Sequence, residues 1–179
     1  HIELPLNIPD DVDGWALKFA RADFEWWRTQ IFRTSRNWKY VGVLHEYPTI
    51  EDKQPNIAKL DGNYVIVART LGARNKDIDP IEKYKKDAEL LENALLEEPD
   101  NIRYQFYLAQ SYFDSQQWEK AEEAYRKRVS MGGWEEEVYY SNYRIAIVKS
   151  MLNRPWEEIM QAFLEAFNSR PIRAEPLFH

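Results

Sequence analysis

The sequence contains no cysteine among its 179 residues. The chain therefore has no disulfide, no thiolate ligand for zinc and no cysteine nucleophile. Structural disulfides are typical of oxidising compartments, so a chain without cysteine fits a reducing one. We expect a cytoplasmic protein whose core and site chemistry depend on other side chains.

Long apolar runs are also lacking. No stretch approaches the roughly 18 apolar residues of a membrane-spanning helix, and no secretory signal pattern opens the chain. A basic excess is lacking as well, because the formal net charge is −6. Such a chain has no general attraction to phosphate backbones, so we expect neither a membrane nor a nucleic acid as partner. The first residue is His1 rather than methionine, which indicates a processed or truncated chain.

Aromatic residues are plentiful, with 7 tryptophans and 11 tyrosines. Together with β-branched residues they dominate short runs that predict strands over residues 15–20, 24–32, 38–44 and 64–67. Asp13-Gly14 and Asp61-Gly62 are turn signals. Asp79-Pro80 interrupts the pattern, so we predict one domain over residues 1–79 and a second over residues 80–179.

The period of the apolar residues becomes helical from Ile81 onward. One face of a first helix, ending at Glu98 before Pro99, carries Tyr84, Ala88, Leu91 and Leu95. Further helices are predicted over residues 102–114, 118–131, 135–151 and 155–168, and another starts after Pro171. Short connections between antiparallel helices make hairpins. The sequence thus predicts an α+β fold, with a small, mostly antiparallel β region followed by an α-hairpin array.

The helical part contains an internal repeat. The segment Trp118-Glu119-Lys120-Ala121 is echoed 38 residues later by Trp156-Glu157-Glu158-Ile159, close to the roughly 34-residue period of tetratricopeptide repeats. The stretch from Ile102 resembles that repeat at its signature positions, which are Leu108, Ala109, Tyr112, Ala121 and Tyr125. Two departures are that Arg128 stands where a small residue is expected and that the second unit is longer.

Several segments follow one another as in one group of glycosyltransferases: FEWWRTQIFR, WKYVGVLHEYP, YVIVARTLGARN, EKYKKDAELLE, EPDNIRYQFYLAQSYFD and YRKRVSMGGWEEEVYYS. From about Phe24 to Leu177 the sequence resembles bacterial, phage and viral glycosyltransferases of the family-2 type. In that group a GT-A catalytic domain is followed by tetratricopeptide-like helices, and some members are similar to peptide S-glycosyltransferases. The resemblance implies that the β region is the edge of a GT-A sheet.

The nucleotide-binding half of such a catalytic domain is missing from this sequence. Asp11-Val12-Asp13 has the spacing of an Asp-x-Asp metal motif, but no apolar strand precedes it and its context predicts a solvated turn. The resemblance therefore implies the C-terminal part of a glycosyltransferase, inactive alone. The parent enzyme would use Mg²⁺ or Mn²⁺ and transfer a sugar from a nucleoside-diphosphate donor to an acceptor such as a peptide or protein.

His45 and Glu46 follow the apolar run of the third predicted strand. The resemblance matches His45 to the group's His-Glu motif, which implies a metal or diphosphate ligand; a strand-end histidine bonded to backbone is the alternative. Glu46 is the candidate catalytic base, because an inverting transferase needs a carboxylate near the acceptor nucleophile. It would otherwise orient His45. Adjacent strand residues point to opposite faces, so both line one site only if the strand ends there, as Pro48 favours.

Arg33 and Trp38 are the candidate substrate-binding residues. Arg33 matches the group's pattern, and its planar guanidinium suits the paired oxygens of a diphosphate. Trp38, like Trp26 and Trp27, offers a ring that can stack on a sugar or an acceptor peptide. Packing in the core is the alternative for all three tryptophans.

The first helix of each hairpin lines the concave face of a tetratricopeptide array. By that family's pattern, the groove residues are Arg103, Phe106, Gln110 and Phe113 in the first repeat and Tyr140 and Arg144 in the second. Such a groove binds an extended peptide or a second protomer; packing on the catalytic domain is the alternative. Three hypotheses follow: a glycosyltransferase fragment, a non-catalytic protein-interaction module, and a segment that forms a homodimer through the helical repeats.

Overall fold

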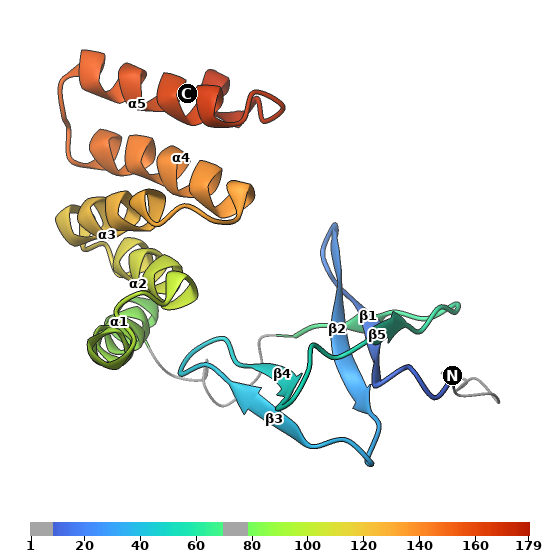
Figure 1. Ribbon diagram of the computed structural model, residues 1–179. Coiled ribbons are helices and arrows are strands. Elements are labelled where there is room, and N and C mark those ends of the chain that lie inside the picture. The colour runs from blue at the N-terminus through green and yellow to red at the C-terminus, as the bar shows by residue number, and fades with distance from the viewer. Residues whose placement is uncertain (1–8, 70–78) are drawn as a thin grey trace. The chain divides into compact units, whose positions relative to one another are not determined.

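Figure 1 shows the computed structural model of the chain, which describes residues 9–69 and 79–179. Strands occupy the first part and helices the second. The predicted α+β fold, with a small and mostly antiparallel β region followed by a helical array, is confirmed. The chain separates into two compact units, His1–Lys76 and Asp77–His179, and the division falls outside the described residues.

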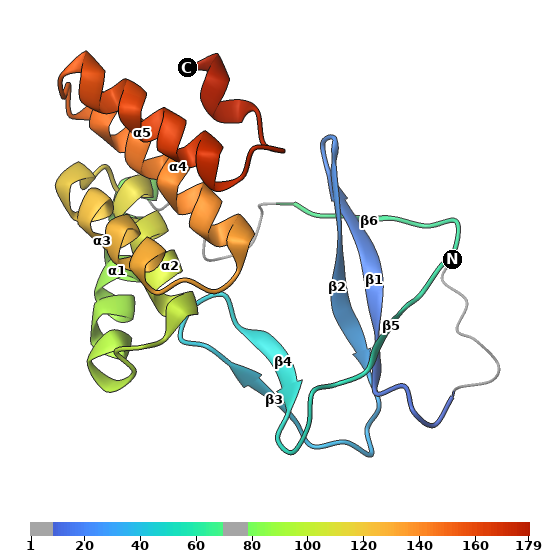
Figure 2. The same cartoon turned by 45° about the horizontal axis from the view of Figure 1, so that its top comes forward.

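A four-stranded sheet forms much of the first unit (Figure 2). Strands β1 (Gly14–Arg21) and β2 (Phe24–Phe32) make an antiparallel hairpin, whose turn contains Ala22 with a positive φ of 50°. Two short strands, β5 (Ile57–Lys59) and β6 (Ile66–Val67), run parallel to β1 along its other side. The order β2-β1-β5 leaves β2 at one edge of the sheet.

The core of the first unit lies on one face of this sheet. Trp15 and Leu17 of β1 are buried beside Val12 and Leu60. Partly buried side chains complete the layer, namely Phe19, Ile31, Ala58, Tyr64 and Ile66. Because successive strand residues point to opposite faces, Lys18 lies on the other side of the sheet.

A second, two-stranded sheet pairs β3 (Trp38–Val41) with β4 (Tyr47–Ile50) in antiparallel fashion. The strand predicted over residues 38–44 is therefore too long. Gly42 has a φ of +108°, which glycine adopts easily but an extended strand does not, so the chain leaves β3 there.

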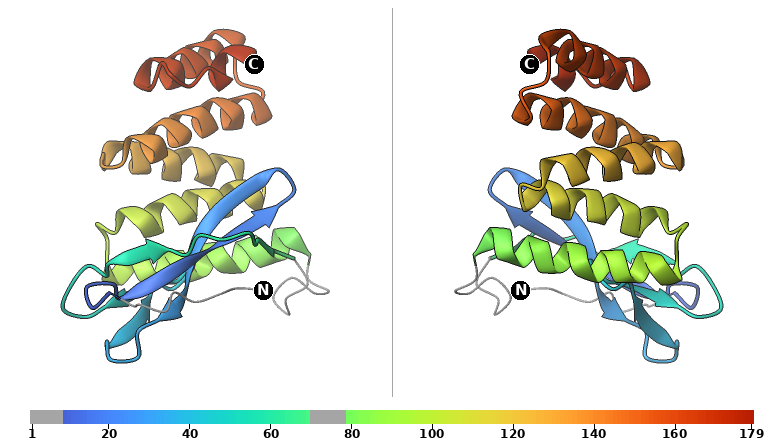
Figure 3. Two further views of the ribbon diagram at one scale, coloured as in Figure 1. Left: turned by 90° about the vertical axis from the view of Figure 1, so that its right-hand side faces the viewer. Right: turned by 90° about the vertical axis from the view of Figure 1, so that its left-hand side faces the viewer.

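In the described part of the second unit, five α-helices follow one another, each packed against the next (Figure 3). They are α1 (Pro80–Glu97), α2 (Ile102–Asp114), α3 (Trp118–Ser130), α4 (Glu135–Met151) and α5 (Trp156–Ser169). A short 3₁₀ helix, Glu175–Phe178, stands where a sixth helix was predicted to start, and it packs against α5. Within the described ranges, no helix combines the length and apolar character that crossing a lipid bilayer requires.

Capping residues set several helix ends. Asp79 accepts a hydrogen bond from the Ile81 N–H at 3.2 Å, and Asn101 accepts one from the Tyr104 N–H at 3.0 Å. Each cap pairs an N–H group that the first turn of a helix leaves without a partner. Gly132, with a φ of +65°, follows the end of α3, and glycine takes this left-handed conformation at helix ends without strain.

The two hairpins α2–α3 and α4–α5 coincide with the internal repeat. Trp118 is the first residue of α3, and Trp156 is the first residue of α5. Helix α4 has 17 residues and α2 has 13, which accounts for the longer second unit. The particular class of helical repeat stays a prediction.

Candidate functional site

Side chains from α2 and α4 meet along one face of the helical unit. The ring centroids of Phe106 and Tyr140 lie 6.0 Å apart. One turn further along α4, the guanidinium carbon of Arg144 lies 4.3 Å from the ring centroid of Phe113 and 4.8 Å from that of Tyr140. These contacts join the two helices at two levels, and all four residues were predicted to line the groove.

The other two predicted groove residues, Arg103 and Gln110, also belong to α2. The Arg103 guanidinium carbon lies 4.9 Å from the ring centroid of Tyr107, and that ring lies 5.6 Å from Phe106. Gln110 lines a cavity together with Phe106. The structure thus brings the six residues together as one aromatic and cationic face, which we call the α2/α4 face.

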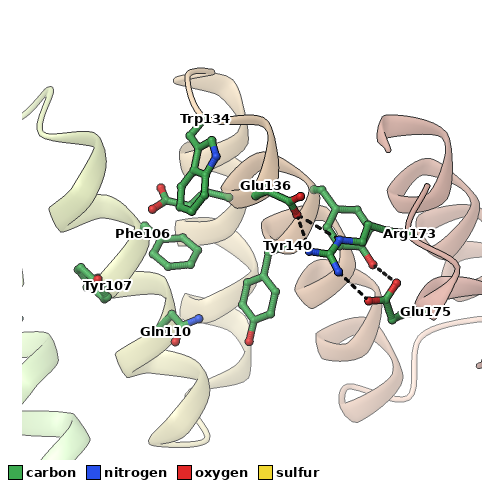
Figure 4. A pocket seen from close by; sticks show the side chains of 10 residues that line it. Phe106, Tyr107, Gln110, Trp134, Glu136, Tyr140, Arg173 and Glu175 are labelled. Carbon is green, nitrogen blue, oxygen red and sulfur yellow. Dashed lines mark hydrogen bonds and ion pairs between the residues drawn. The ribbon is translucent and has the colours of Figure 1, made fainter. Parts of the chain in front are cut away.

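A cavity of about 390 Å³ opens at one end of the α2/α4 face (Figure 4). Its aromatic lining comprises Phe106, Tyr107, Trp134, Tyr139 and Tyr140. Trp134, just before α4, is 66% exposed, and its indole lies next to Phe106 in Figure 4. An open aromatic hollow of this kind can hold an apolar side chain of a ligand.

The segment that follows α5 forms one wall of the cavity. Arg173 lies 3.1 Å from the Glu136 carboxylate of α4 and 3.5 Å from Glu175, as Figure 4 shows. The Tyr139 hydroxyl donates a hydrogen bond to Glu175 at 3.3 Å. Burial raises the pKa of Tyr139 to about 12, and the charge of Glu175 adds to the rise. Sequence reasoning missed this wall and Trp134, although the Gly-Gly-Trp motif before α4 marks the position of the indole.

Arg144 is the cation at the other end of the α2/α4 face. It is half-buried, its Nε donates to the Tyr140 hydroxyl at 2.7 Å, and no carboxylate of the described residues forms an ion pair with it. Its charge also acts on Asp114, where burial raises the carboxyl pKa and Arg144 opposes that rise. A half-buried guanidinium without an ion pair can bind a carboxylate of a ligand.

Tyr125 belongs to α3. Its side chain is fully buried, and its hydroxyl has no hydrogen-bond partner among the described residues. Burial raises the pKa of Tyr125 far above its ordinary value, and the charge of Arg144 partly offsets the rise.

His45 and Glu46 lie in the connection between β3 and β4. Both side chains are exposed, and His45 has a φ of 52°. Because they belong to a turn and not to a strand, alternation between the faces of a sheet does not separate them. Their roles as metal ligand and catalytic base stay predictions.

The resemblance implies Mg²⁺ or Mn²⁺, ions that take about six ligands. The ranges 9–69 and 79–179 hold no group of three or more His, Asp or Glu side chains placed to bind a metal. His45 and Glu46 therefore do not make a metal site by themselves. Further ligands would have to come from the parent enzyme and its diphosphate substrate.

Arg33 and Trp38 lie where β2 leads into β3. The Arg33 guanidinium donates to the carbonyl oxygens of Val12 at 2.9 Å and Pro9 at 2.6 Å. The Trp38 indole N–H donates to the Arg33 carbonyl at 3.1 Å, and the ring packs edge-on against Phe32 at 5.0 Å. Both side chains thus have structural partners within the unit, and their substrate-binding roles stay predictions.

Asp13 was predicted to lie in a solvated turn, and this is wrong. Its side chain is fully buried, accepts hydrogen bonds from Arg36 at 2.6 Å and the Asn56 N–H at 2.9 Å, and pairs with Lys53 at 2.6 Å. Hydrogen bonds from Lys53, then Asn56, then Arg36 hold the pKa of Asp13 well below its usual range. The carboxylate therefore links distant segments of the first unit.

The described residues form an α+β fold whose second unit is an array of helical hairpins. No protein-family model matches the sequence, and no curated protein matches it significantly. The resemblances to glycosyltransferases and to tetratricopeptide repeats therefore depend on the quoted motifs and remain predictions.

Proposed function

We propose that the helical unit binds an extended peptide segment of another protein along the α2/α4 face. The observation that carries this proposal is the unbroken series of contacts from Phe106 through Tyr140 to Arg144 and Phe113, with a cavity at one end. Stacked helical hairpins use such a face to bind peptides, because side chains from successive first helices line it together. This is the interaction-module hypothesis.

The chemistry of the face suggests the chemistry of the peptide. The cavity beside Trp134 would take an aromatic or aliphatic side chain, and Arg144 would take a carboxylate. Phe106 and Phe113 are seven residues apart on α2, which corresponds to roughly 10 Å along the helix, or about three residues of an extended peptide. We therefore expect the apolar and acidic side chains about three residues apart in the peptide.

The test uses fluorescein-labelled peptides in which a tryptophan precedes a glutamate by about three residues, compared with the same peptides carrying glutamine. Fluorescence anisotropy with the full chain should show binding that Phe106→Ala and Arg144→Gln each weaken by about tenfold. Arg126→Gln removes the same charge from an exposed site on α3 and should leave the affinity unchanged. The effects of Arg144→Gln and of the peptide glutamine should be non-additive, because both remove the same ion pair.

Absence of binding by every peptide would contradict the proposal. If Arg144→Gln lowers the affinity for the glutamate and the glutamine peptide equally, the ion pair between Arg144 and the peptide glutamate is contradicted. A homodimer that occupies the α2/α4 face is the competing hypothesis. Phe106→Ala would then convert dimer to monomer in light scattering, and no peptide would bind until the dimer dissociates.

We also propose that the chain is part of a family-2-type glycosyltransferase, in which the helical unit would hold the acceptor peptide. The order of the quoted motifs supports this, as does the exposed position of His45 next to Glu46 in one turn. In the complete gene product, His45→Ala should weaken joint binding of Mn²⁺ and a nucleoside diphosphate at least about tenfold in calorimetry. His179→Ala is the matched histidine control, and unchanged affinity in His45→Ala would exclude the metal role.

A further inference from the structure

The outer edge of β2 carries backbone groups that no strand of the described residues pairs with. In the β1–β2 ladder, Ala16 lies opposite Thr29, Lys18 opposite Trp27 and Ala20 opposite Glu25. The carbonyls of Ala16 and Ala20 accept hydrogen bonds from Leu60 and Ala68, on the side away from β2.

Opposite residues of an antiparallel pair turn their backbone groups either toward each other or both away. Glu25, Trp27 and Thr29 therefore direct their N–H and C=O groups outward. The Thr29 carbonyl accepts a hydrogen bond from the exposed Gln30 side chain at 3.0 Å, which a partner strand would replace. No strand of the described residues pairs with that edge.

The side chains along this edge suit a further strand. β2 contains neither glycine nor proline, and Phe24 is 68% exposed, with its ring 5.8 Å from that of Trp26. On the other face, the ammonium groups of Lys18 and Lys59 lie 5.7 and 5.2 Å from the Trp27 ring centroid. An exposed edge strand rich in aromatic residues is a ready template for pairing with another strand.

We propose that a second copy of this chain pairs its β2 with this edge, antiparallel, about a two-fold axis through Trp27. Such an axis, normal to the sheet, places opposite each residue one that faces the same side. With the axis at Trp27, the two Trp27 residues meet and Glu25 lies opposite Thr29 of the second copy. Trp26 then lies opposite Arg28 of the second copy, a cation–π pair.

Other two-fold registers are less favourable. An axis at Glu25 would oppose two carboxylates, and an axis at Arg28 would oppose two guanidinium groups, both of which are destabilising. An axis at Trp26 would carry the partner strand past Phe24 into the turn. An axis at Thr29 would place the partner strand beside the irregular part of β2, where the β1–β2 ladder shifts register between Trp15 and Ala16. The axis at Trp27 gives the longest regular pairing without opposed like charges.

This interface uses none of the residues of the α2/α4 face. It is small, so the dimer should form reversibly, with a mass that rises from monomer to dimer over an about 100-fold range of protein concentration in analytical ultracentrifugation. Glu25→Pro removes an outward N–H without touching the β1–β2 hydrogen bonds, and proline is tolerated on edge strands. This variant should stay monomeric over the same range. Its circular dichroism should match that of the unaltered chain.

The absence of cysteine allows a second test that keeps Trp27. Glu25→Cys and Thr29→Cys proteins, mixed in equal amounts and mildly oxidised, should cross-link mainly with each other. The opposed Cα atoms of such a pair are about 5.5 Å apart, within the range that a disulfide spans. Two copies of Glu25→Cys would place their cysteines roughly 13 Å apart, too far for a disulfide.

Three results would overturn the proposal. The first is a monomer at every concentration, and the second is a dimer that persists in folded Glu25→Pro. The third is equal yields of like and unlike cross-linked pairs. A dimer through the helical unit would give the second and third results.

Discussion

The guanidinium of Arg128 is fully buried, and its Nη2 lies 2.9 Å from the carboxylate of Glu137. A second donor, Nη1, bonds to the Gly132 carbonyl at 2.6 Å. The residue that departs from the tetratricopeptide pattern thus ties the end of α3 to the start of α4. An arginine can replace a small residue here because its charge and its donors find partners across the turn.

Loss of the Glu137 charge should therefore destabilise the helical unit. In Glu137→Gln the guanidinium of Arg128 stays buried without its counter-charge, and we expect a loss of about 1–3 kcal/mol in the free energy of unfolding. Urea unfolding followed by circular dichroism at about 222 nm, where helices absorb, measures this free energy. Glu157→Gln, on the exposed start of α5, is the matched control and should change little. Equal stabilities of the two variants would contradict the role of the ion pair.

Asp13 predicts a dependence of stability on pH. Its folded pKa lies well below the ordinary value of 3.8, so the carboxylate stabilises the fold above that value. The contribution is lost as the pH falls below the ordinary pKa towards the folded one. Asp13→Asn should lower the urea midpoint at neutral pH, and the difference from the unaltered chain should shrink below about pH 4. Tryptophan fluorescence during urea unfolding at several pH values gives the urea midpoints of both proteins.

The control for Asp13 is Asp61→Asn, which alters an exposed carboxylate in the same unit. Its urea midpoint should follow that of the unaltered chain at every pH. A difference between Asp13→Asn and the unaltered chain that stays constant down to the lowest pH would show that the carboxylate charge is not responsible.

Gly14 should not tolerate a side chain. A Cβ at this position would lie 2.7 Å from the Ile31 carbonyl oxygen of the paired strand, too close for the backbone to stay where it is. We expect Gly14→Ala to destabilise the first unit by roughly 1–3 kcal/mol, as overpacking of a core does. Gly132→Ala meets no atom within 4 Å and should cost only about 1 kcal/mol for its left-handed backbone. The midpoint temperatures of thermal unfolding compare the two variants. An unchanged midpoint in Gly14→Ala would contradict the close approach of Gly14 to the Ile31 carbonyl.

The Tyr139 hydroxyl reports whether the segment after α5 lies against α4. Burial raises its pKa to about 12, and Glu175 contributes to the rise. Glu175→Gln should lower the pKa of Tyr139 towards the ordinary value of 10.0, because a nearby negative charge is removed. NMR of tyrosine labelled with ¹³C at Cζ follows this titration. Glu165→Gln on α5 is the control, and an unchanged pKa in Glu175→Gln would contradict the contact.

The helices could be predicted closely because local signals set both their faces and their ends. Asn101 and Gly132 mark a start and a stop, and the predicted bounds of the five α-helices differ from the observed ones by one residue at most. The short strands were harder. Pro48 interrupts the apolar pattern of β4, β5 has three residues, and β6 has two of the four predicted. Strands this short depend on pairing with β1 or β3, which a single segment does not reveal.

The α2/α4 face and Asp13 show where sequence reasoning succeeds and fails. The groove residues repeat at helical spacing on α2 and α4, so a known pattern could place them on one face. The partners of Asp13 lie 23 and 43 positions away along the chain, at Arg36 and Asn56, and no local pattern indicates such pairs. The same holds for Arg173, which returns to Glu136 over 37 positions.

Two kinds of force hold the cavity on the helical unit, and they respond differently to ionic strength. The floor depends on aromatic contacts such as that between Phe106 and Tyr140, which dissolved ions do not screen. The wall depends on ion pairs of Arg173, which is 45% exposed, with Glu136 and Glu175. Counter-ions at about 1 M reduce the Debye length to roughly 3 Å and weaken such pairs. Concentrated salt should thus loosen the wall while the aromatic floor keeps its form, so that the cavity becomes wider as the ionic strength rises.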